Sequence, residues 1–327
     1  ICYGADPGVI GSSAAASGGD GTITYEWRAN GNPIASTNSA TYDPPAGLIA
    51  TTTYTRWAKD ATCNTTFSQS TGTWTVTVLP ELVAGLASSP QTICYNTAPA
   101  ALVATAATGG SGSFTYQWQS SADGASGWAN VSGATNLVYN PPALTSSTWY
   151  RVVYTAAGLP ACGTVESNSV QITVTPLLEV TATATAVACN NGTATVTLSP
   201  TGGTAPYSYT FNGVPDADGT INNVAAGTYN WSVTDAHSCG PVTGTTVITQ
   251  PAAISNLSAS VTSPITCNGG TGTVTLTASG GTGTLRFTFN GQTNTTGVFS
   301  GIHAGIGLAY SVTDDNNCGP VFGSIDV

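Results

Sequence analysis

The sequence predicts an all-β protein built from four tandem antiparallel β-sandwich modules. Three observations predict this fold. The chain repeats itself at intervals of roughly 80 residues, apolar and polar residues alternate over short runs, and the eight cysteines fall two to each repeat. Gly-Gly, Pro-Pro and Asn-Gly pairs interrupt the chain often, and no stretch has the period of a long helix.

The strictest repeat is the segment from Cys189 to Cys239, which returns as Cys267 to Cys318. The offset is 78 positions and becomes 79 near the end. Both copies carry the blocks Cys-Asn-x-Gly-Thr, Gly-Gly-Thr, Phe-Asn-Gly, Ser-Val-Thr-Asp and Cys-Gly-Pro-Val in the same order. Such regularity indicates an array of similar structural units.

A looser repeat covers the first half of the chain. Ile1-Cys2-Tyr3 matches Ile93-Cys94-Tyr95, and both copies continue through Gly-Gly, Tyr-x-Trp and Tyr-x-Pro-Pro. In this alignment Arg56 corresponds to Arg151. The repeats place module one at residues 1–79, module two at 80–176, module three at 177–251 and module four at 252–327, with proline at or near each closing strand.

Module one is expected to lack its first strand. Residues 81–92 supply such a strand before Cys94, whereas no counterpart precedes Cys2. Two explanations stay open: the segment was cut from a longer array, or another chain supplies the strand by β-augmentation.

Alternating rows of apolar residues predict the core strands. A row in module two contains Phe114, Tyr116 and Trp118, and Asn212-Gly213 predicts a tight hairpin turn in module three. The other rows expected to face inward are Ala194, Val196 and Leu198; Tyr207, Tyr209 and Phe211; Tyr229, Trp231 and Val233; and Val274, Leu276, Phe287, Phe289, Tyr310 and Val312.

The cysteines predict disulfides, because no CxxC pair occurs and the two histidines cannot complete four zinc sites. We expect one bridge inside each module, pairing Cys2 with Cys63, Cys94 with Cys162, Cys189 with Cys239 and Cys267 with Cys318. Each would stabilise a small module by roughly 4 kcal/mol. Disulfides place the protein outside the reducing cytosol.

Composition excludes several classes of function. Charged residues make up 6% of the chain and the net charge is −10, with no basic cluster, so nucleic acid is not an expected partner. No apolar run is long enough to cross a membrane. No Gly-x-Ser-x-Gly motif appears, and His237 and His303 occupy non-equivalent loop positions, so no catalytic residue is expected.

Two candidate ligand sites remain. The carboxylates of Asp216, Asp218, Asp314 and Asp315 could hold calcium, with loop solvation as the alternative. Trp128 lies in a predicted loop and could contact a surface glycan. Of the other aromatic candidates, Trp27, Trp118, Trp149 and Tyr150, most are expected in the core because they lie in alternating strands.

The order Cys-Asn-x-Gly-Thr, Gly-Gly-Thr, Asn-Gly, Val-Thr-Asp, Cys in modules three and four resembles the SprB-type repeat of large Bacteroidota surface adhesins. Modules one and two resemble the immunoglobulin-like modules found beside such repeats. The resemblance implies immunoglobulin-like sandwiches, type IX secretion and a cell-surface location, with a role in gliding motility or attachment. Module four departs from module three at Leu285-Arg286-Phe287 and in its longer segment 304–310.

The expected function is therefore a non-enzymatic stalk of an extracellular adhesin, whose partners are other modules of the same chain or neighbouring copies. A subunit of a self-assembling filament is one alternative. Carbohydrate-binding accessory modules of a secreted enzyme are the other.

Overall fold

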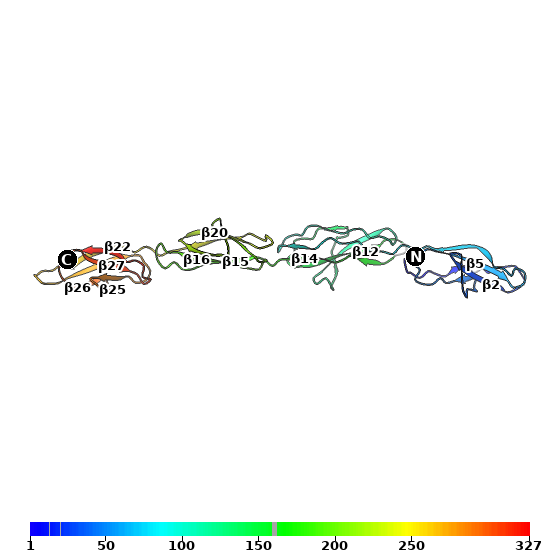
Figure 1. Ribbon diagram of the computed structural model, residues 1–327, viewed down its shortest axis with the longest axis horizontal. Helices are drawn as coiled ribbons and strands as arrows, with labels where there is room; N and C mark the ends of the chain where they lie inside the picture. The colour runs from blue at the N-terminus through cyan, green and yellow to red at the C-terminus, as the bar shows by residue number, and fades with distance from the viewer. Residues whose placement is uncertain (13, 20, 159–161) are drawn as a thin grey trace. The chain divides into compact units, whose positions relative to one another are not determined.

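The computed structural model describes residues 1–12, 14–19, 21–158 and 162–327. Every regular element in these ranges is a β-strand, so the predicted all-β class is confirmed (Figure 1). The chain divides into two compact units, Ile1–Val174 and Thr175–Val327, and each unit holds two of the predicted modules. The module boundaries inside these units stay predictions.

Module one has a four-stranded sheet, ordered β3-β2-β5-β6, and a separate pair, β1-β4. Its small core is formed by Trp27, Tyr54 and Val76. The strands are β1 (Ile10–Gly11), β2 (Ile23–Ala29), β3 (Asn32–Ile34), β4 (Thr41–Tyr42), β5 (Thr52–Asp60) and β6 (Ser68–Val76).

Module two has the larger sheet β10-β9-β12-β14-β7, with β13 also paired to β12, and the pair β11-β8. Strands β7 and β14 are parallel. Trp118 is fully buried, as the alternation predicts. The strands are β7 (Gln91–Ile93), β8 (Leu102–Val103), β9 (Phe114–Ser121), β10 (Ala129–Asn130), β11 (Val138–Tyr139), β12 (Thr148–Ala156), β13 (Thr164–Glu166) and β14 (Val170–Val174).

Module three has a three-stranded sheet, β15-β16-β19, and a four-stranded sheet, β18-β17-β20-β21. Val196 and Val233 are fully buried, so both of their predicted rows face the core. Asn212 and Gly213 have φ of 49° and 81°, which confirms the predicted turn. The strands are β15 (Glu179–Ala184), β16 (Ala194–Thr201), β17 (Ser208–Phe211), β18 (Val214–Asp216), β19 (Thr220–Val224), β20 (Gly227–Thr234) and β21 (Val242–Ile248).

Module four repeats this arrangement with the sheets β22-β23-β26 and β25-β24-β27-β28. All six residues of its predicted core rows are buried. The strands are β22 (Ser255–Ser263), β23 (Gly272–Ser279), β24 (Arg286–Phe289), β25 (Gln292–Asn294), β26 (Val298–Ile302), β27 (Leu308–Thr313) and β28 (Val321–Ile325).

The strand register corrects one part of the sequence alignment. Arg56 lies opposite Trp27, and Val152 lies opposite Trp118, so Arg56 corresponds to Val152 and not to Arg151. A shift of one residue moves a side chain to the other face of a sheet. Arg56 is therefore buried, and its Nη1 donates to the carbonyl oxygen of Ala40 at 2.9 Å.

The start of module one pairs as the corresponding part of module two does. The Ile1 nitrogen donates to the Thr77 oxygen at 2.7 Å, and Leu79 N–H donates to the Ile1 oxygen at 2.9 Å. In module two, the segment before Cys94 also forms isolated antiparallel β-bridges, between Val83 and Thr108 and between Ala87 and Ala104. Two explanations for the start of module one stay untested: the segment was cut from a longer array, or another chain supplies the strand.

Candidate functional site

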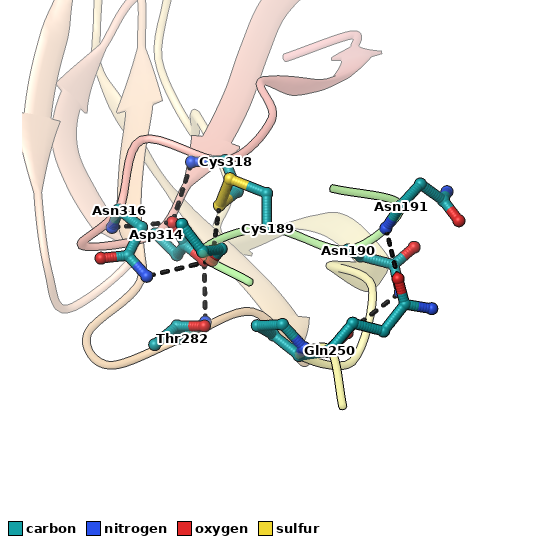
Figure 2. Close-up of a disulfide and its surroundings, with 10 residues drawn as sticks. Cys189, Asn190, Asn191, Gln250, Thr282, Asp314, Asn316 and Cys318 are labelled. Atoms are coloured by element: carbon teal, nitrogen blue, oxygen red, sulfur yellow. Dashed lines mark hydrogen bonds between the residues drawn. A yellow bond between two sulfur atoms is a disulfide. The ribbon is translucent and has the colours of Figure 1, made fainter. Parts of the chain in front are cut away.

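The first cysteine of module three lies at the end where the chain leaves the module. Cys189 sits in the loop between β15 and β16, and Gly192 N–H donates to its carbonyl oxygen at 2.9 Å. The next two residues contact the departing chain. Asn190 Nδ2 donates to the Pro251 oxygen at 3.0 Å, and Asn191 N–H donates to Gln250 Oε1 at 2.7 Å (Figure 2).

The second cysteine of module three lies at the opposite end, where the chain enters. Cys239 follows β20, and its N–H donates to Asp235 Oδ1 at 2.7 Å. Asp235 Oδ2 accepts from Thr204 N–H at 2.9 Å, and Gly203 N–H donates to the oxygen of Pro176, at the start of the module. The loop that carries Cys239 is thereby fixed to the entry end.

The predicted pairing of Cys189 with Cys239 is therefore wrong. Strand β16 runs between the two ends of the module, and its eight residues span about 25 Å at roughly 3.3 Å per residue. A disulfide needs Cα atoms within about 7 Å of each other. The same separation applies to Cys267 and Cys318 in module four.

The described bridges join successive modules instead. Cys189 of module three bonds to Cys318 of module four, with Cα atoms 5.5 Å apart (Figure 2). Cys2 of module one bonds to Cys162 of module two, with Cα atoms 5.3 Å apart. The predicted bridges from Cys2 to Cys63 and from Cys94 to Cys162 are therefore also wrong.

Both bonds follow one rule: the first cysteine of a module bonds to the second cysteine of the module that follows it. Cys94 in the first unit is also disulfide-bonded. So is Cys239 in the second unit. Cys267 is an exposed thiol.

A buried carboxylate shapes the loop that presents Cys318 to Cys189. Asp314 is 0% exposed and accepts from the N–H groups of Thr282 at 2.7 Å, Asn316 at 2.9 Å and Cys318 at 2.9 Å (Figure 2). Burial alone would raise the pKa of Asp314, but the N–H donors hold this pKa below its ordinary value. Asn316 Nδ2 also donates across the junction to the Ala188 oxygen at 3.0 Å.

Module one has an equivalent aspartate, whose carboxylate accepts backbone N–H groups of the loop that carries Cys63. Asp60 Oδ1 accepts from Thr62 N–H at 2.8 Å and from Cys63 N–H at 2.9 Å. These bonds lower the pKa of Asp60 to about 2. In module two the register places the buried Ala156 at this position, since it lies opposite Phe114 as Asp60 lies opposite Ile23.

The roles of Asp60 and Asp235 were not among those predicted from the sequence. The available signal was the recurring aspartate three or four residues before the second cysteine of modules one, three and four. A short polar side chain followed by a loop is typical of a residue that accepts hydrogen bonds from nearby backbone N–H groups.

The four candidate calcium carboxylates occupy two separate places. Asp216 Oδ1 accepts from Gly219 N–H at 2.7 Å, and Asp218 Oδ1 accepts from Thr220 N–H at 2.9 Å. Asp315, next to Asp314, forms an ion pair with Arg286 at 3.1 Å. No group of three or more His, Cys, Asp or Glu side chains in the described residues could hold a metal ion. Calcium binding at these residues stays a prediction.

Trp128 is half-buried, and a cation covers one face of its ring. The guanidinium carbon of Arg151 lies 4.3 Å from the ring centroid. Arg151 is fixed by an ion pair with Glu166 and by a bond from its Nε to Gln119 Oε1 at 2.9 Å. A sugar stacked on that face would have to displace Arg151, so a glycan could contact only the part of the ring that Arg151 does not cover. Glycan binding at Trp128 stays a prediction.

Several solved structures match this chain at low sequence identity and low TM-score. The N-terminal eight Ig domains of Down Syndrome Cell Adhesion Molecule are 14% identical, with 93% of this chain and 52% of that chain covered and a TM-score of 0.31. For Mouse Cadherin-23 EC22-24 the values are 14%, 76%, 92% and 0.39, and for an S-layer protein they are 16%, 93%, 50% and 0.25. The chain spans about half the length of the first and the last of these.

Family models match module two and parts of modules three and four. Residues 83–176 match a family described only as a domain of unknown function (DUF8696). A search of curated proteins found no match. Separately, no helix in the described ranges is long and apolar enough to span a membrane. Residues 181–216 and 259–294 match the SprB repeat. Modules three and four therefore contain SprB-type repeats.

Proposed function

We propose that this chain is a stalk segment of an extracellular repeat adhesin, in which disulfides carry tension from module to module. The observation that carries the proposal is that each described bridge joins two successive modules. A bridge inside one module would protect only that module from unfolding. A bridge between neighbours also keeps the junction between the two modules from opening when the chain is pulled.

The positions of the bonded cysteines determine which residues bear force. In sequence, Cys2 and Cys162 lie near the two termini of the first unit, and Cys189 and Cys318 lie near the two termini of the second. In space, each bonded pair lies where two modules meet. A force applied to the chain ends passes through these sulfur atoms. The polypeptide enclosed by each bridge is then not stretched, even where its hydrogen bonds break.

The cellular setting is part of the same proposal. Disulfides persist in oxidising surroundings, and structural bridges of this kind are rare in the cytosol. Together with the SprB matches, they support a location outside the cell. We propose export by the type IX route to a Bacteroidota cell surface, where the stalk serves attachment or gliding.

Single-molecule stretching between the two termini tests the proposal. The bridges span 160 and 129 positions, so only about 40 of the 327 residues lie outside them. At roughly 3.5 Å per residue, the oxidised chain should reach about 140 Å and the reduced chain about 1,100 Å.

Bridges inside each module would leave roughly 100 residues outside, and the oxidised chain would then reach about 340 Å. An oxidised chain that lengthens to that value would overturn the proposal. Reduction with a small thiol in the same experiment is the control, because it must release the full length whichever pairing is present.

A self-assembling filament is the second candidate, and the exposed thiol of Cys267 favours it. Negative-stain microscopy of the purified chain distinguishes the two functions. A stalk gives separate particles, whereas a filament subunit gives ordered polymers under oxidising conditions.

A further inference from the structure

Cys267 occupies in module four the place that Cys189 occupies in module three. Each cysteine lies in the loop between the first two strands of its module. Gly270 N–H donates to the Cys267 oxygen at 2.9 Å, just as Gly192 N–H donates to the Cys189 oxygen. Cys189 is bonded to the following module, whereas Cys267 is an exposed thiol.

The residues around Cys267 are more exposed than the equivalent residues around Cys189. Val187, two residues before Cys189, is buried, whereas its equivalent Ile265 is half-buried. Cys189 and Asn190 are half-buried, whereas Cys267 and Asn268 are exposed. In module three, the following module covers this surface through the disulfide and through the bond from Asn316 to the Ala188 oxygen.

The loop of Cys267 also lies at the end where the chain leaves module four. Strand β23 begins at Gly272, which pairs with Ile302, and the following loop carries Gly305. Gly305 and Val327 exchange two backbone hydrogen bonds, at 2.9 and 3.0 Å. Ile306, beside this pair, is 91% exposed. The exit end of module four thus presents an unbonded thiol and a large apolar side chain together.

We propose that Cys267 forms a disulfide with a further module of the same chain, placed after Val327, through the cysteine of that module's Asp-x-x-x-Cys loop. This partner is defined by its chemistry: a buried aspartate must hold the cysteine loop at the entry end, as Asp314 holds Cys318. The inference rests on the proposed function in one respect, since it supplies the next link of the stalk.

The reaction is thiol oxidation by disulfide exchange. The Cys267 thiolate attacks a small-molecule disulfide and releases one small thiol. The partner thiolate then attacks the resulting mixed disulfide and releases the second. One protein S–S bond forms and one small-molecule S–S bond breaks, while the two thiol protons of the protein end on the two small thiols.

A tandem extension of the chain tests the inference. Val327 lies six positions after Val321, as Ile248 lies six positions after Val242, so a second copy of residues 249–327 placed after Val327 continues the register. The extended chain is refolded with oxidised and reduced glutathione, alkylated, and digested without reduction. Mass spectrometry should find Cys267 bonded to the added copy of Cys318, and Cys267 should lose its reactivity toward the alkylating reagent.

The matched control carries serine in place of the added copy of Cys318, and it should restore full alkylation of Cys267. Three outcomes would overturn the inference: Cys267 stays alkylated in the extended chain, it bonds to a cysteine within its own module, or it bonds to another copy of the chain as a covalent dimer. Because this experiment identifies bonds and the stretching experiment measures length under force, each proposal can fail while the other stands.

Discussion

At the scale of single residues, an aspartate carboxylate holds the backbone of the loop that carries the second cysteine in modules one, three and four. Asp60, Asp235 and Asp314 all accept backbone N–H bonds from the loop that ends in the second cysteine. Charged acceptors bind such donors more strongly than neutral ones. The carboxylate therefore fixes the backbone that positions the sulfur, which is why we assign it a structural role in bridge formation.

Replacing Asp314 by alanine should destabilise the second unit by about 3 kcal/mol, because three N–H groups lose their acceptor at a buried position. Urea unfolding measures the loss. Asp315→Ala is the matched control, since Asp315 is exposed, and it should cause a much smaller loss. Equal losses in the two variants would show that the buried carboxylate has no special role.

Stability should fall in acid because the pKa values of Asp60 and Asp314 are below the ordinary value of 3.8. A folded-state pKa below the unfolded one stabilises the fold fully above about pH 4, and this stabilisation is lost as the pH falls toward 2. The thermal midpoint should therefore be level above about pH 5 and drop below pH 4. Asp60→Asn should weaken that drop, and a wild-type midpoint that stays level to pH 2 would contradict the account.

Much of the core could be predicted residue by residue. Trp27 and Trp118 are fully buried because both occupy inward positions of alternating strands, and alternation is readable in a sequence. The inward position of Arg56 could not be read. Counting residues from the aligned motifs placed it one position out, and only the pairing of β5 with β2 determines which face it occupies.

At the scale of elements, a Gly-Gly turn lies against the chain that enters modules two, three and four. A Cβ atom on Gly109, Gly202 or Gly280 would lie within 2.0 Å of a carbonyl oxygen of that entering segment. In module one, no described atom lies within 4 Å of the corresponding position on Gly18. The close approach of this turn to the entering chain is therefore shared by modules two, three and four.

Gly280→Ala should destabilise module four by more than about 2 kcal/mol, since it combines a positive φ of 82° with a clash against the Ala253 oxygen. Gly291→Ala is the control for backbone strain alone, because its φ is 78° and nothing lies within 4 Å of its added Cβ. Its loss should be about 1 kcal/mol. Chemical denaturation of both variants decides, and a Gly280 variant no weaker than the Gly291 variant would refute the close approach.

Strands and turns were largely predictable, whereas their pairing was only partly so. The alternating rows identified β9, β16, β20 and β23, and the Asn-Gly pair identified the β17–β18 turn. The parallel pairing of β7 with β14 was not predicted. These strands are distant in sequence, and a three-residue strand carries too little pattern to indicate its neighbour.

At the scale of the whole molecule, the repeat and its SprB resemblance were readable, but the disulfide pairing was not. Two cysteines per module suggested one bridge per module, because sequence proximity was the available guide. The structure puts Cys189 and Cys239 at opposite ends of module three, where a strand of eight residues separates them. Only the strand directions reveal this, so the pairing follows from the fold and not from the spacing.

Disulfide mapping of the native, unreduced chain tests the central claim most directly. The thiols are alkylated at low pH, the protein is digested with pepsin, and linked peptides are identified by mass spectrometry. The account predicts peptides that join Cys2 to Cys162 and Cys189 to Cys318. Peptides that join Cys2 to Cys63 and Cys189 to Cys239 would contradict it.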